Sequence, residues 1–78
     1  MTNGGSRVRA TVRDYNRAIL DYTEAIKFDQ KYVDAYNNRG LAHKALGRKA
    51  EAIADFRKAL SIDPTDKKAQ NELKSLGG

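Results

Sequence analysis

The stretch that decides the fold is Tyr36–Pro64, YNNRGLAHKALGRKAEAIADFRKALSIDP. In its first part Tyr36, Gly40 and His43 recur at spacings of four and three, so they share one face of a helix. Gly47 ends that helix, because glycine adopts the left-handed conformation that closes a helical end. A second helix follows until Pro64 stops it, with these apolar residues at helical spacing: Ala52, Ile53, Phe56, Ala59 and Leu60. The stretch predicts a helical hairpin.

Seven residues of this hairpin stand at a characteristic spacing: Tyr36, Gly40, His43, Ala52, Phe56, Ala59 and Pro64. Their spacing resembles the tetratricopeptide repeat, a helix-turn-helix unit of about 34 residues. The resemblance covers a full repeat at 33–66 and departs at two positions. The family usually has tyrosine in place of His43 and leucine in place of Arg39. We expect the aliphatic stem of Arg39 to pack while its guanidinium reaches water.

The chain also repeats itself upstream of the hairpin. Residues 14–30 align with 48–64, and five residues recur identically in the two segments. These are Ala18, Ile19, Asp21, Ala25 and Asp29, which return as Ala52, Ile53, Asp55, Ala59 and Asp63. The alignment predicts that 14–30 is the second half of a preceding repeat.

The upstream copy is expected to belong to one long helix over 7–28. Its apolar residues alternate at spacings of four and three, which is typical of a continuous helix with a coiled-coil-like seam. This seam consists of Val8, Val12, Tyr15, Ile19, Tyr22 and Ile26. The position that matches the turn residue Gly47 is Arg13, so a turn is disfavoured there.

The seam leads to a prediction of self-association. In the family, a second helix rests on the first helix of its own repeat, and only 1–12 are available for that first helix here. A homodimer, formed by exchange of helices between two copies (domain swapping), would cover the seam. The alternative is that Tyr32–Leu46 and the last helix of the chain cover the seam fully.

The expected architecture is an all-α, tetratricopeptide-like domain at 7–76, with helices at about 7–28, 33–46, 49–61 and 66–76. Thr65 or Asp66 is expected to cap the last helix. Its inner stripe is Ala69, Leu73 and Leu76, and its polar outer face is typical of a capping helix. The residues at 1–6 and 77–78 are expected to be flexible ends.

Composition restricts the function further. The 78 residues contain no cysteine, which excludes a disulfide framework and a thiolate metal site. There is no long apolar run, so neither a signal peptide nor a membrane segment is expected, and a cytoplasmic location is the default. His43 is the only histidine, and no serine lies in a nucleophile motif. We therefore predict no catalytic residue, metal, cofactor or enzyme activity, and a packing role for His43.

The family resemblance implies a binding function. First helices of successive repeats line a concave groove that holds a partner peptide, and here they would present Asp34, Asn37, Asn38, Leu41, Lys44 and Ala45. Leu41 would anchor an apolar side chain, and Lys44 would pair with a carboxylate. Asn38 matches one residue of the family's clamp for chaperone tails, but Asp34 and Leu41 depart from that pattern. The alternative for this stripe is a solvated helix face.

Charge supplies the alternative function. The net charge is +5, and basic residues concentrate in two zones. One zone is Arg7, Arg9, Arg13 and Arg17, and the other is Arg39, Lys44, Arg48 and Lys49. These zones either solvate the surface or bind RNA, DNA or acidic peptides. We predict a protein-interaction scaffold with an unidentified protein or peptide partner, and nucleic-acid binding is the alternative.

Overall fold

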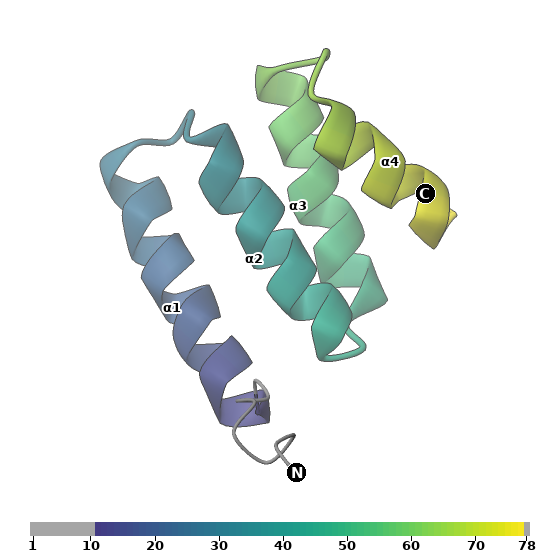
Figure 1. Cartoon of the computed structure of the whole chain (residues 1–78). Helices are drawn as coiled ribbons and strands as arrows, with labels where there is room; N and C mark the ends of the chain where they lie inside the picture. Colours follow the sequence, from purple (N-terminus) through teal and green to yellow (C-terminus); the bar gives the residue numbers. More distant parts are fainter. Residues whose placement is uncertain (1–10, 78) are drawn as a thin grey trace, which may run out of the picture.

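The computed structural model describes residues 11–77, and its four elements within that range are all helices (Figure 1). They are α1 (Val12–Phe28), α2 (Val33–Ala45), α3 (Lys49–Ile62) and α4 (Lys67–Leu76). The main contacts run between neighbours along the chain, α1 with α2, α2 with α3, and α3 with α4. The predicted all-α class and hairpin architecture are confirmed.

The α2–α3 hairpin holds the centre of the core. Phe56 is completely buried, and its ring lies against Gly40 of α2. A Cβ atom at Gly40 would lie only 2.9 Å from Cζ of Phe56, so glycine lets the two helices approach this closely. Gly47 has φ of 78° and makes the turn as predicted, while the Arg48 N–H donates to the carbonyl of His43 at 2.8 Å.

The α4 helix packs along the hairpin, mainly against α3. Its N-cap is Asp66, whose Oδ2 accepts a hydrogen bond from the Ala69 N–H at 3.1 Å. Ala69 and Leu73 are buried, and Leu76 packs partly against the same core. The predicted cap and inner stripe of this helix are confirmed. Gly77, which was expected to belong to a flexible end, terminates α4 in the left-handed conformation.

The α1 helix begins later than the sequence predicted. We expected it to start at Arg7, whereas its first residue is Val12. The reason is a capping box at Thr11: its Oγ1 accepts from the Asp14 N–H at 3.2 Å, and the Asp14 carboxylate accepts from the Thr11 N–H at 3.0 Å. Residues 1–10 and 78 lie outside the described range, so the expectations for Arg7, Val8, Arg9, the flexible end at 1–6 and Gly78 stay predictions.

The burial of α1 differs from that of the other helices. It packs mainly on α2, at the outer side of the molecule (Figure 1), and none of its residues is buried. Leu20 and Phe28 have exposed fractions of 63% and 90%. The outer α1–α2 layer is therefore where apolar surface is left uncovered.

No helix in the described range is long and apolar enough to cross a membrane.

Candidate functional site

A groove of about 290 Å³ lies between α1 and α2. Its walls are Tyr15, Ala18 and Tyr22 of α1, and Asn38, Leu41, Ala42 and Ala45 of α2. This volume is at the lower limit for a site that encloses a small molecule. The lining is aromatic and aliphatic apart from the Asn38 amide and the hydroxyls of the two tyrosines, which suits a polypeptide with apolar side chains.

Helical spacing brings these residues to one place. Tyr15, Ala18 and Tyr22 follow one another at three and four residues, so they form a stripe along α1. Leu41 and Ala45 are four residues apart and form the facing stripe on α2. Small residues in both stripes keep the groove open, while both tyrosine side chains stay half-buried.

Beneath the groove, Arg39 connects three helices. Its Nε and Nη2 donate to the two carboxylate oxygens of Asp55 on α3, at 2.9 and 2.7 Å. Its Nη1 donates to Oγ1 of Thr23 on α1 at 3.2 Å. The side chains of Arg39 and Asp55 are only 21% and 8% exposed. The hydrogen bonds that Arg39 donates to Asp55 raise the pKa of the Arg39 guanidinium above its usual value.

This geometry corrects one expectation. We predicted that the guanidinium of Arg39 would reach water, whereas it is bonded between Asp55 of α3 and Thr23 of α1. The guanidinium turns inward because Asp55 is buried on the facing helix and needs a partner. The same contact places the Arg39 guanidinium carbon 5.5 Å from the centre of the Tyr36 ring.

Two further side chains tie α2 to α4. Asn37 is 2% exposed, and its Nδ2 donates to Oδ2 of Asp66 at 2.7 Å. Lys44 pairs with Glu72 at 2.7 Å. Both contacts hold the capping helix in place, so these two residues are already engaged on the side of α2 that faces away from the groove.

His43 lies in the hairpin interface with its side chain 13% exposed. Its Nε2 is 3.8 Å from Asp55, and its Nδ1 is buried without a hydrogen-bond partner. Burial lowers the pKa of His43 below its usual value, and this effect outweighs the attraction of Asp55.

The lowered pKa predicts a loss of stability in weak acid. The unfolded chain takes up a proton near the ordinary histidine pKa of about 6.5, before the folded protein does. The stability is therefore fully present above that pH, and it falls as the pH drops through the lower folded value, by at most about 1.4 kcal/mol per unit. Urea unfolding at several pH values should show a shallower dependence for His43→Gln, and equal slopes in the two proteins would contradict the assignment.

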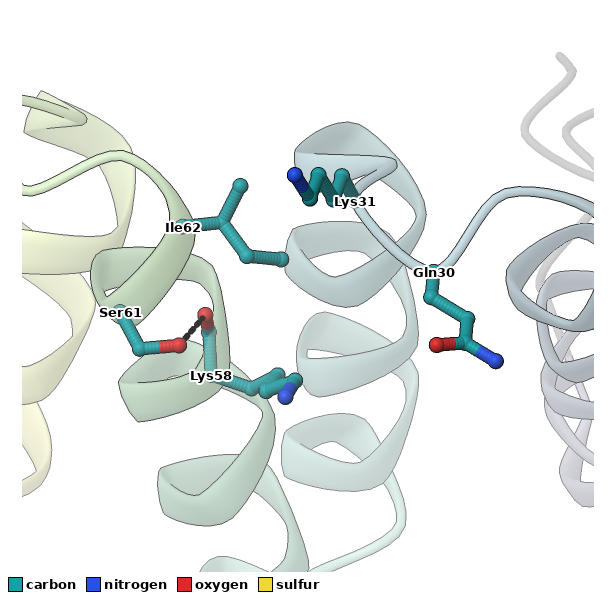
Figure 2. A pocket seen from close by; sticks show the side chains of 5 residues that line it. All are labelled: Gln30, Lys31, Lys58, Ser61 and Ile62. Atoms are coloured by element: carbon teal, nitrogen blue, oxygen red, sulfur yellow. Dashed lines mark hydrogen bonds between the residues drawn. The ribbon is translucent and has the colours of Figure 1, made fainter.

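A second opening lies where the α1–α2 connection meets the end of α3 (Figure 2). Gln30, Lys31, Lys58, Ser61 and Ile62 line it, and the Ser61 hydroxyl donates to the backbone carbonyl of Lys58 at 2.7 Å. That hydrogen bond is local to α3. Among residues 11–77, no group of three histidine, aspartate or glutamate side chains could hold a metal ion.

Comparison with known families decides the identity of this helical arrangement. A model described as "Tetratricopeptide repeat" matches 33–66, and a model described as "TPR repeat" matches 14–47. The chain belongs to the tetratricopeptide repeat family. The two matches overlap across α2, which is the helix that both the groove and the buried ion pair share.

Curated relatives carry this tetratricopeptide segment within longer chains. Serine/threonine-protein phosphatase 5 of Rattus norvegicus is 35% identical over 68 residues, which are 85% of this chain and 14% of that protein. The Translocon at the outer membrane of chloroplasts 64 of Pisum sativum is 47% identical over 62 residues, 80% of this chain and 10% of that protein. Hsp70-Hsp90 organizing protein 1 of Glycine max is 41% identical over 51 residues, which are 65% of this chain and 9% of that protein. This chain therefore spans a small fraction of these relatives.

The predicted peptide-binding set is divided by the tetratricopeptide hairpin. Asn38, Leu41 and Ala45 line the groove together with α1. Asn37 and Lys44 instead contact α4, and Asp34 is exposed at the start of α2. Asn38, Leu41 and Ala45 are therefore the members of the set that this structure brings together at one opening.

The predicted self-association seam is divided in a similar way. Tyr15 and Tyr22 line the groove, Ile19 is half-buried and Ile26 packs partly against the core. Val12 is 64% exposed. The sequence analysis did not identify Leu20 and Phe28 as exposed apolar residues of α1. The four-and-three spacing selects the face toward α2, and these two residues lie outside that face. The ion pair was also missed, although the repetition of Asp21 as Asp55 marked the acidic position.

Proposed function

We propose that this protein is a non-catalytic interaction module of the tetratricopeptide type, which binds a polypeptide segment in the groove between α1 and α2. The observation that carries the proposal is the lining of that groove, in which the half-buried Leu41 and the exposed Ala45 lie opposite the half-buried Tyr15 and Tyr22. Side chains of this kind gain free energy when a partner removes them from water.

The family relatives support a protein as the partner. One of them is named an organizer of Hsp70 and Hsp90, so by its name it acts on other proteins. From it we infer only the class of partner, because Asp34 and Leu41 of this chain depart from the pattern of a chaperone clamp. Arg39 and Lys44 are paired with carboxylates, which removes half of the second basic zone from any nucleic-acid surface.

The proposal predicts that peptide binding depends on Leu41. A displayed library of random peptides should yield binders that are lost in Leu41→Glu, because a carboxylate in the groove opposes burial of apolar side chains. Ala45→Glu, at an exposed position, should give the same loss without touching the core. Ala54→Glu, at an exposed position on α3, is the matched control and should retain the binders.

Circular dichroism of each variant would verify that helicity is retained. A library that yields no binder dependent on Leu41 would reject the groove as the functional site.

The homodimer is tested by the mass of the chain alone, measured by light scattering across a range of concentrations. A dimer that Tyr22→Lys dissociates would make a second copy of the chain the partner.

A further inference from the structure

The face of α1 that lines the groove is a copy of a face that is fully covered elsewhere in the molecule. Ala18, Tyr22 and Ala25 of α1 lie 34 residues before Ala52, Phe56 and Ala59 of α3. The three residues of α3 have no exposed surface, whereas their three counterparts are half-buried. The helix that covers this face of α3 therefore shows what kind of helix would fit the corresponding face of α1.

The acidic residue beside this face shows the same contrast. Asp55 of α3 is buried and accepts two hydrogen bonds from Arg39. Its counterpart Asp21 has a side chain that is 70% exposed, at 3.8 Å from Arg17 of its own helix. An exposed pair within one helix contributes little stability, so Asp21 is available to a better partner.

The element that covers the copy on α3 is α2, and two adjacent residues of α2 make the decisive contacts. Gly40 lies against the ring of Phe56, and Arg39 bonds the carboxylate of Asp55. A helix that covers α1 in the same way needs a small residue against Tyr22 and, immediately before it, an arginine that reaches Asp21. Its other edge would meet Leu41 and Ala45.

We propose that α1 binds, from another protein, an amphipathic helix with the pattern of α2, in which an arginine is followed directly by a glycine. The inference rests on the proposed function and names the partner of the same groove. A second copy of this chain is not the expected source, because its own α2 is already buried against its α3. The Tyr22 hydroxyl, which Phe56 lacks, is the one chemical difference at the ring between the two faces.

The test uses a synthetic helix as the partner. A fluorescent, end-blocked peptide with the sequence of residues 32–46, YVDAYNNRGLAHKAL, is titrated with the full chain, and saturable binding is expected. A leucine in place of the peptide's glycine should abolish binding, because the added side chain meets the aromatic ring. Asp21→Lys should weaken binding about threefold to tenfold, and a glutamate in place of the peptide's arginine should restore it.

Two protein variants serve as controls. Glu51→Lys makes the same charge change at an exposed position of α3 and should leave the affinity unchanged. Tyr22→Phe reproduces the covered face and should bind at least as tightly as the parent. Binding that ignores Asp21→Lys would mean that the peptide replaces α2 on α3, and it would overturn the proposal.

The outcomes separate this inference from the proposed function. Failure of the α2 peptide to bind, while library peptides still bind in a Leu41-dependent way, would overturn the inference and leave the function standing. A chain that is dimeric alone, and whose dimer excludes the peptide, would overturn the choice of another protein as the source of the helix.

Discussion

Phe56→Ala is expected to unfold the domain. Phe56 has no exposed surface and contacts a core of few large side chains. Truncation of a buried phenylalanine to alanine costs about 3–5 kcal/mol, through lost burial and the cavity left behind. A domain of this size rarely has more than about 3–5 kcal/mol of stability in total. Far-ultraviolet circular dichroism should therefore show loss of most helical signal without denaturant.

The matched control is Phe28→Ala, at the end of α1. That phenylalanine is 90% exposed, so its truncation should change stability by no more than about 0.5 kcal/mol. A cooperative urea transition for Phe56→Ala at the midpoint of the parent protein would contradict the assignment of Phe56 to the centre of the core.

Asp55→Ala is expected to have the second largest effect, at about 3 kcal/mol. Removal of the carboxylate leaves the guanidinium of Arg39 with little access to water and without its partner. Urea unfolding measures the loss. Arg39→Leu introduced together with Asp55→Ala should recover most of the lost stability, because neither charge is then left alone in the hairpin.

The internal repeat supplies the control for this prediction. Asp21→Ala removes the equivalent carboxylate on α1, where the pair with Arg17 is largely exposed. Its effect should stay within about 0.5–1 kcal/mol. Equal losses for Asp21→Ala and Asp55→Ala would show that burial does not determine the strength of the pair.

Much of the fold was predictable from spacing. The signature that places Gly40 opposite Phe56 specifies a hairpin, and Gly47 and Asp66 mark helix ends by local chemistry that does not depend on the rest of the chain. The start of α1 was not predicted, because a seam with regular spacing gave no reason to stop at Thr11. The capping box that stops it is visible in the sequence as a threonine followed three residues later by an acid.

The candidate site was less predictable than the fold. Periodicity indicates that Leu41 and Ala45 share a face, but it does not say which helix lies opposite that face. The division of Asn37 from Asn38 depends on the position of α4, which a single helix pattern cannot fix. The orientation of the Arg39 guanidinium was not predicted for a similar reason. It is decided by Asp55, an acid sixteen residues later on another helix.

The three-way position of Arg39 has a consequence for how the chain folds. In a linear array each helix interacts with its immediate neighbours only, so the end helices can fray independently of the middle. The Arg39 side chain of α2 couples two of these neighbour contacts, because one guanidinium bonds Thr23 of α1 and Asp55 of α3 at the same time. Fraying of α1 exposes this guanidinium to water and weakens its hold on α3. Unfolding of α1 is thereby linked to unfolding of the α2–α3 hairpin in a single cooperative transition.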